Sequence, residues 1–185
     1  GYGPADIDRQ ISHLRDHGTG INTALMTGHN TIRRIVMKDD FRRHAAEKEV
    51  AAMARLVREA MEKGAWGLSS GLEYVPARWS NTDEIVQLVR EITPFGGIYM
   101  AHERSSGKTP MWYLPSRHEP HQPSMLDNIE ELIEVGKRTG AVVVATHLKI
   151  KGADFWGTGG AVVNLIEQAR NKGVSIWADC YPYTT

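Results

Sequence analysis

Two histidines and a lysine follow apolar runs in this sequence, at places where their side chains could carry out chemistry. His147 and Lys149 come directly after the run AVVVA at residues 141–145, and His102 follows GGIYMA at residues 96–101. Neutral imidazole is a common zinc ligand, so two such histidines on neighbouring strands could share one ion. A single histidine at a strand end is more often only a hydrogen-bonded residue of the rim.

Other polar residues near these runs have both a chemical and an ordinary interpretation. Arg104 follows one histidine at the spacing at which Lys149 follows the other, and both could bind a substrate carboxylate or face solvent. Tyr181 could offer a phenol, or could pack in an aromatic turn fixed by proline. Glu73 could be a general base or a salt-bridging group. His118 and His121 are expected to be exposed to solvent.

Apolar periodicity predicts strands that alternate with helices. We predict strands over residues 20–27, 65–71, 96–102, 141–147 and 174–181, and helices over residues 45–63, 82–93, 125–139 and 161–172. Asn81 or Thr82 and then Ser124 are the expected N-caps, and Gly140 is an expected helix end. The run at residues 141–145 is expected to be buried on both faces of a sheet.

Strands separated by helices of this length predict right-handed crossovers and a parallel sheet. In such a sheet the carboxyl ends of the strands share one edge, so the polar residues that follow them should meet there. We predict one α/β unit over residues 1–185, because no linker or repeat divides the chain. The Pro-rich segment 106–124 is too long for an ordinary connection and is predicted to be an inserted loop.

Composition excludes several classes of protein. With 22 basic and 22 acidic side chains the formal net charge is zero, so we expect a small-molecule partner and neither nucleic acid nor membrane. One cysteine, Cys180, forms no internal disulfide, and no leader or apolar span is apparent, which favours a cytoplasmic location. No dinucleotide-binding, P-loop or nucleophile-elbow motif is present.

Five short motifs occur in an order that resembles a known family. They are GLSSGLEYVPA, AHER, THLK, WG and ADCYPYT, preceded by INTALMTGHNTIRR. Together they resemble the D-aminoacylase (N-acyl-D-amino-acid deacylase) branch of the amidohydrolase superfamily. The resemblance covers nearly the whole chain.

The resemblance implies part of a (β/α)₈ TIM barrel, with these strands as barrel strands three to seven. It implies one or two zinc ions, with His102 and His147 as ligands, and hydrolysis of the amide bond of N-acyl-D-amino acids. Lys149 and Tyr181 match positions that bind the substrate's α-carboxylate, and Arg104 matches a recurrent basic position. We include Tyr74 of the GLEY motif among the substrate-binding candidates.

The family's histidine pair on the first strand, its cysteine ligand and its catalytic aspartate have no counterpart here. A closed barrel needs about 200 residues or more, so we expect a portion of a longer enzyme, inactive by itself, whose general base lies outside these residues. Two other interpretations remain open at this point. One is an amidohydrolase of cyclic amides, such as a hydantoinase or dihydropyrimidinase, and the other is an open doubly wound α/β domain that binds a small ligand without catalysis.

Overall fold

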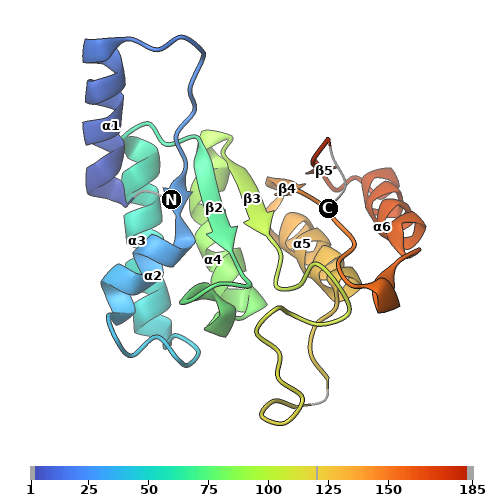
Figure 1. Ribbon diagram of the computed structural model, residues 1–185. Coiled ribbons are helices and arrows are strands. Elements are labelled where there is room, and N and C mark those ends of the chain that lie inside the picture. Colours follow the sequence, from blue (N-terminus) through green and yellow to red (C-terminus); the bar gives the residue numbers. More distant parts are fainter. Residues whose placement is uncertain (1–2, 120, 183–185) are drawn as a thin grey trace.

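The computed structural model describes residues 3–119 and 121–182, in which helices alternate with strands (Figure 1). The strands are β1 (Thr27–Gly28), β2 (Gly67–Gly71), β3 (Ile98–His102), β4 (Val142–Ala145) and β5 (Ile176–Ala178). The helices are α1 (Pro4–His17), α2 (His29–Met37), α3 (Glu47–Glu62), α4 (Thr82–Ile92), α5 (Met125–Thr139) and α6 (Gly159–Asn171), with short 3₁₀ helices at η1 (Ala77–Trp79), η2 (Thr93–Phe95) and η3 (Ala153–Phe155). None of the helices in these ranges is long and apolar enough to cross a membrane.

The strands form one parallel sheet whose spatial order is the order of the sequence, β1-β2-β3-β4-β5. Each crossover therefore places the next strand beside the previous one, as in a β/α barrel. An open doubly wound sheet instead reverses its strand order at a switch point. The doubly wound alternative is therefore wrong, and the prediction of barrel-type βα units is confirmed.

The main helices pack on one face of this sheet. Consecutive helices from α3 to α6 contact one another, and α4 and α5 lie behind the strands in Figure 1. The strand side chains on that covered face are buried: Leu68, Tyr99, Ala101, Val143, Ala145 and Ile176. On the other face Val142 and Val144 are only half-buried. The expectation that residues 141–145 are buried on both faces is wrong, because α4 and α5 cover only one side.

Local capping chemistry explains where two of the helices begin and end. Asn81 is the N-cap of α4, and its side chain accepts a hydrogen bond of 2.8 Å from the backbone N–H of Glu84. Ser124 and Asp127 form a capping box at the start of α5. That helix ends at Gly140, which has a φ of 71°, a value that glycine adopts without strain. The predicted caps are confirmed.

The first predicted strand is mostly wrong. Of residues 20–27, only Thr27 lies in β1, and Ile21 is 78% exposed. The Leu25 carbonyl still accepts a hydrogen bond of 2.8 Å from the N–H of Trp66. Trp66 lies just before β2, which begins at Gly67. A strand needs a partner along its length, so the residues before Leu25 have none to pair with in β2. Helices α1 and α2 lie outside the predicted elements.

A buried ion cluster fixes the end of β1 against the helices. Glu84 on α4 accepts hydrogen bonds from His29 Nε2 at 2.8 Å and from Arg33 Nη1 at 2.5 Å, and all three side chains are at most 2% exposed. Arg33 also donates to the carbonyls of Phe41 and Arg43. The strand-end residue His29 is therefore part of the helical layer, where it bonds Glu84.

We predict that Glu84→Gln lowers the free energy of unfolding by roughly 3–5 kcal/mol at pH 7, because it leaves Arg33 buried without its counter-charge. Burial raises the pKa of Glu84, but the bond from His29 and the charges of His29 and Arg33 outweigh it, so the pKa lies below its ordinary value of 4.5. The ionised Glu84 carboxylate therefore contributes its full stabilisation of the native state at pH values above 4.5. This stabilisation is lost as the pH falls through the lower pKa of Glu84 in the folded state. Denaturant unfolding of both proteins between pH 7 and pH 3 measures the effect.

The matched control is Glu59→Gln, because Glu59 forms an exposed pair with Lys63 on the surface of α3. An exposed pair contributes about 1 kcal/mol or less. Equal losses in the two variants at pH 7, or an unchanged acid dependence in Glu84→Gln, would show that the buried cluster is not a main source of stability.

Candidate metal and substrate site

The sheet register brings the ends of neighbouring strands to one edge. Gly71, the last residue of β2, pairs with His102, the last residue of β3. One residue earlier, Ala101 pairs with Ala145 at the end of β4, which in turn pairs with Ala178 at the end of β5. The residues that follow these positions therefore meet at one rim, the side at which β/α barrels place their active sites.

His102 and His147 are in contact at this rim. The closest approach is 3.0 Å between His102 Nδ1 and His147 Nε2, and the ring planes are 74° apart. Two nitrogen ligands at about 2.05 Å from a tetrahedral zinc ion stand ~3.3 Å apart. The two nitrogens are therefore close enough to bind the same ion after a small adjustment of the rings.

Glu73 fixes the orientation of the His102 ring. This side chain follows β2, is 1% exposed, and its Oε2 accepts a hydrogen bond of 3.0 Å from His102 Nε2. Burial raises the pKa of Glu73, but the hydrogen bonds from His102 and from the N–H of Met111 bring it below its ordinary value. A proton on Nε2 satisfies this bond and leaves the Nδ1 lone pair facing His147. Carboxylates hold metal-binding histidines in the same manner.

His147 is held by its backbone and by a neighbouring ammonium. Its N–H donates to the carboxylate of Asp179, which follows β5 and also accepts from the hydroxyl of Thr146. Lys149 Nζ donates to His147 Nδ1 at 3.1 Å and to its carbonyl at 3.0 Å. Burial and then the charge of Lys149 lower the pKa of His147, which favours the neutral ring that metals require. Donation then runs in one direction from Lys149 through His147 and His102 to Glu73.

Two tyrosines flank the histidine pair. The Tyr74 ring centroid lies 4.4 Å from that of His102, and the Tyr181 centroid lies 5.8 Å from that of His147. Lys149 Nζ stands 5.5 Å from the centre of the Tyr181 ring. Both tyrosines are nearly half exposed. The structure thus brings five of the six predicted site residues together.

Arg104 is the sixth, and its side chain points elsewhere. Its guanidinium donates to the Glu131 carboxylate of α5 at 2.9 and 3.0 Å and to Ser80 Oγ at 3.3 Å. The spacing argument requires an extended chain after His102, but β3 ends at that residue. These contacts account for the guanidinium without a ligand, and a substrate-binding role for Arg104 stays a prediction.

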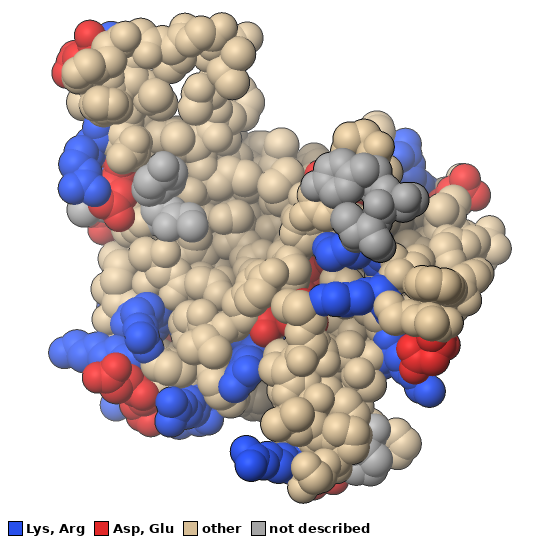
Figure 2. All heavy atoms as spheres, in the orientation of Figure 1, with Lys and Arg blue, Asp and Glu red and all other residues tan. Residues whose placement is uncertain are grey.

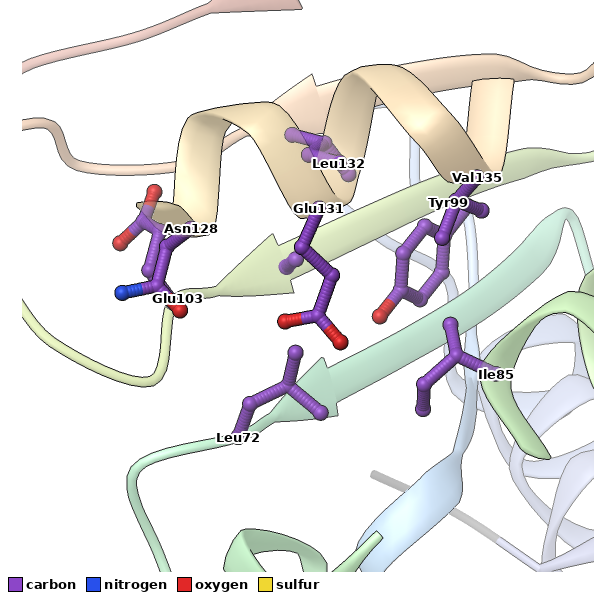
Figure 3. Close-up of a pocket in the computed structure, with 9 residues that line it drawn as sticks. Leu72, Ile85, Tyr99, Glu103, Asn128, Glu131, Leu132 and Val135 are labelled. Atoms are coloured by element: carbon purple, nitrogen blue, oxygen red, sulfur yellow. The ribbon is translucent and has the colours of Figure 1, made fainter. Parts of the chain in front are cut away.

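Glu103 is a buried carboxylate that the sequence did not single out. Within residues 3–119 and 121–182, neither of its side-chain oxygens has a hydrogen-bond partner, and burial raises the pKa of this carboxyl to about 7. It faces a cavity of about 10 Å³ between β2, β3 and α5, together with Asn128 and Glu131 (Figure 3). Such a volume admits about one water molecule. The cavity is therefore too small for a substrate. Alternation of side chains along β3 was the sequence signal that could have placed Glu103 on the face opposite His102.

The Pro-rich loop of residues 106–124 packs beside the site. His118 was expected to be exposed, and this is wrong: it is half-buried, with its ring edge against Trp112 at 5.1 Å and its Nδ1 accepting from the N–H of Leu114 at 2.8 Å. The reason is local, because aromatic residues of the same loop provide a surface for the ring. His121 is exposed as expected.

The histidine pair could supply two of the four ligands that a tetrahedral metal site requires. Among the residues that the structure describes, no group of three or more His, Cys, Asp or Glu side chains has the geometry to hold a metal ion. Glu73 bonds His102 Nε2, whereas His147 contacts His102 Nδ1. Glu73 therefore orients the His102 ring and is not placed to be a third ligand of an ion between the two histidines.

Comparison with known proteins gives relatives of one kind. No protein-family model matches the chain. The D-aminoacylase of Alcaligenes xylosoxydans xylosoxydans is 35% identical over 174 residues, which are 94% of this chain and 32% of that protein. A solved N-acyl-D-glutamate deacylase from Bordetella bronchiseptica, complexed with zinc and a phosphonate inhibitor, aligns with a TM-score of 0.84 and 27% identity over 97% of this chain and 34% of its own.

A more distant structure shares the fold alone. The L-hydantoinase of Arthrobacter aurescens aligns with a TM-score of 0.54 and 15% identity over 95% of this chain and 36% of its own. The chain thus spans about a third of the length of the proteins it matches. Together with the sequential parallel strands, these likenesses show that the chain belongs to the D-aminoacylase (N-acyl-D-amino-acid deacylase) branch of the amidohydrolase superfamily.

Proposed function

We propose that this chain is the portion of a metal-dependent amidohydrolase barrel that contains strands three to seven. The whole protein would hydrolyse the amide bond of N-acyl-D-amino acids and release a carboxylate and a D-amino acid. The observation that carries the proposal is the contact of 3.0 Å between His102 and His147 at the ends of adjacent strands. The relatives that cover nearly all of this chain, a D-aminoacylase and an N-acyl-D-glutamate deacylase, support the same reaction.

Zinc is the metal we propose, as one or two ions, with His102 Nδ1 and His147 Nε2 as ligands. The donor set fits, because both imidazoles can be neutral and Glu73 holds the first in the tautomer that exposes Nδ1. When bound, zinc would supply a water molecule of lowered pKa and a Lewis acid for the scissile carbonyl. The remaining ligands and the general base, expected to be an aspartate, would lie outside these residues.

Lys149, Tyr181 and Tyr74 are the proposed contacts of the substrate. With a metal on Nε2, His147 would carry its proton on Nδ1 and could no longer accept from Lys149. The ammonium would then be available for the α-carboxylate, and the nearby phenol of Tyr181 could share it. Fixing the carboxylate beside the metal would select the D configuration, because it determines which face of the substrate meets the ion.

A small-molecule substrate agrees with the surface in Figure 2. Lys and Arg side chains form several separate groups on that face, and acidic side chains adjoin some of them. Of the two alternative functions, the cyclic-amide reaction has weaker support, since the L-hydantoinase is 15% identical and the deacylase from Bordetella bronchiseptica 27%. The non-catalytic doubly wound domain is excluded, because the order of the described strands has no reversal.

We predict that His147→Ala in the full-length protein loses zinc and turnover together, because the ring provides one of the ligands. Removing a residue that only orients a ligand costs about 10–100-fold, so kcat for an N-acyl-D-amino acid should fall by more than about 100-fold. Zinc content after dialysis and steady-state kinetics measure the two effects. His121→Ala is the control, since His121 is exposed in the loop. Retained zinc with normal turnover in the His147 variant would remove this residue from the mechanism.

We predict that Lys149→Ala mainly raises KM for substrates with a carboxylate and changes kcat less. A charge-assisted hydrogen bond contributes about 1.5–3 kcal/mol, which corresponds to about 10- to 100-fold in KM. Kinetics with an N-acyl-D-amino acid and with the matching uncharged N-acyl amide test this, and Lys172→Ala at the exposed end of α6 is the control. An equal effect on both substrates would argue against carboxylate binding by Lys149.

A further inference from the structure

We propose that Glu73 is a positioning residue that couples the loop of residues 106–124 to the metal ligand His102. The inference deepens the proposed function and rests on it. The two oxygens of this carboxylate bond two different parts of the chain. Oε2 accepts from His102 Nε2 at 3.0 Å, and Oε1 accepts from the backbone N–H of Met111 in the loop at 2.6 Å.

The backbone on the Glu73 side is fixed to the sheet. The N–H of Leu72 donates to the carbonyl of His102 at 2.9 Å, which extends the pairing of β2 and β3 by one residue. Leu72 is 4% exposed and belongs to the hydrophobic core, and the N–H of Tyr74 closes a turn onto Gly71 at 3.1 Å. The backbone that carries Glu73 is therefore tied to the sheet, so only its side chain can respond to a movement of the loop.

Two backbone hydrogen bonds hold the start of the loop, one to the segment after β4 and one to the first residue of α5. Lys151 N donates to the Ser106 carbonyl at 2.8 Å, and Met125 N donates to the Gly107 carbonyl at 2.8 Å. A Cβ at Gly107 would stand 2.3 Å from the carbonyl oxygen of Lys151, so only glycine allows this approach. Further along the loop, the bond from Met111 to Glu73 links it to the carboxylate that holds His102.

The coupling follows from the cost of a buried charge. Glu73 is 1% exposed, so the loss of the Met111 N–H leaves a desolvated carboxylate oxygen without its donor. The carboxylate must then rotate or admit water, and either change alters the bond that keeps the proton on His102 Nε2. Because coupling between two sites is reciprocal, zinc bound at Nδ1 would also favour the docked position of the loop.

The test compares two variants of the full-length protein. In Glu73→Gln an amide replaces a carboxylate of the same shape, and we expect the dissociation constant for zinc to rise about 10- to 100-fold. Met111→Pro removes the loop donor together with the Met111 side chain and keeps both Glu73 and His102, and we expect a rise in the same direction. Competition with a chelator gives the dissociation constants. Leu114→Pro is the matched control, because the N–H of Leu114 bonds His118 within the loop and not Glu73.

Trypsin cleavage after the exposed Arg117 of the loop gives a readout apart from activity. We expect zinc to slow cleavage there in the wild-type protein and in Leu114→Pro, and to have no effect in Glu73→Gln or Met111→Pro. If His147→Ala shows that zinc binds at the histidine pair but Glu73→Gln and Met111→Pro bind it normally, this inference alone is overturned. A wild-type protein that binds zinc without the histidine pair, or not at all, would overturn both this inference and the proposed function.

Discussion

The parallel register of β3 and β4 is the constraint on which the candidate site depends. Pairing of Ala101 with Ala145 brings both strands to an end at the same edge, so the histidines that follow come into contact although they are 45 residues apart in the chain. A slip of one residue would move the side chains of a strand to its other face. Burial of Tyr99 and Val143 under the helices opposes that slip, so core packing also fixes the separation of His102 and His147.

Around this pair, the polar groups form one connected arrangement. Lys149, His147 and His102 can each donate to the next in a single direction that ends at Glu73, and this carboxylate also accepts from the loop. Such a network is strongest in a site shielded from water. Glu73 is buried, whereas Tyr74 and Tyr181 beside the histidine pair are nearly half exposed. The buried carboxylate of Glu73 holds the orientation of the His102 ring.

A second polar cluster serves the fold instead. His29, Arg33 and Glu84 are buried between β1, α2 and α4, where the charges of Arg33 and Glu84 compensate each other. The two clusters show why a histidine at a strand end is ambiguous: His29 follows β1 as His147 follows β4, yet it bonds a helix carboxylate. The chain spans about a third of the length of the relatives it matches.

The sequence by itself determined the alternation of strands and helices, the caps at Asn81 and Ser124, and the residues expected at the rim. These features depend on neighbours a few positions apart, and the motifs GLEY, AHER and THLK indicated the family. Only the tertiary structure decided that residues 20–26 lack a strand partner, that His118 is half-buried, and that Arg104 bonds Glu131. Arg104 contacts a distant helix, residues 20–26 extend beyond the start of β2, and His118 packs on Trp112 within its own irregular loop. Periodicity along the sequence carries no information about such contacts.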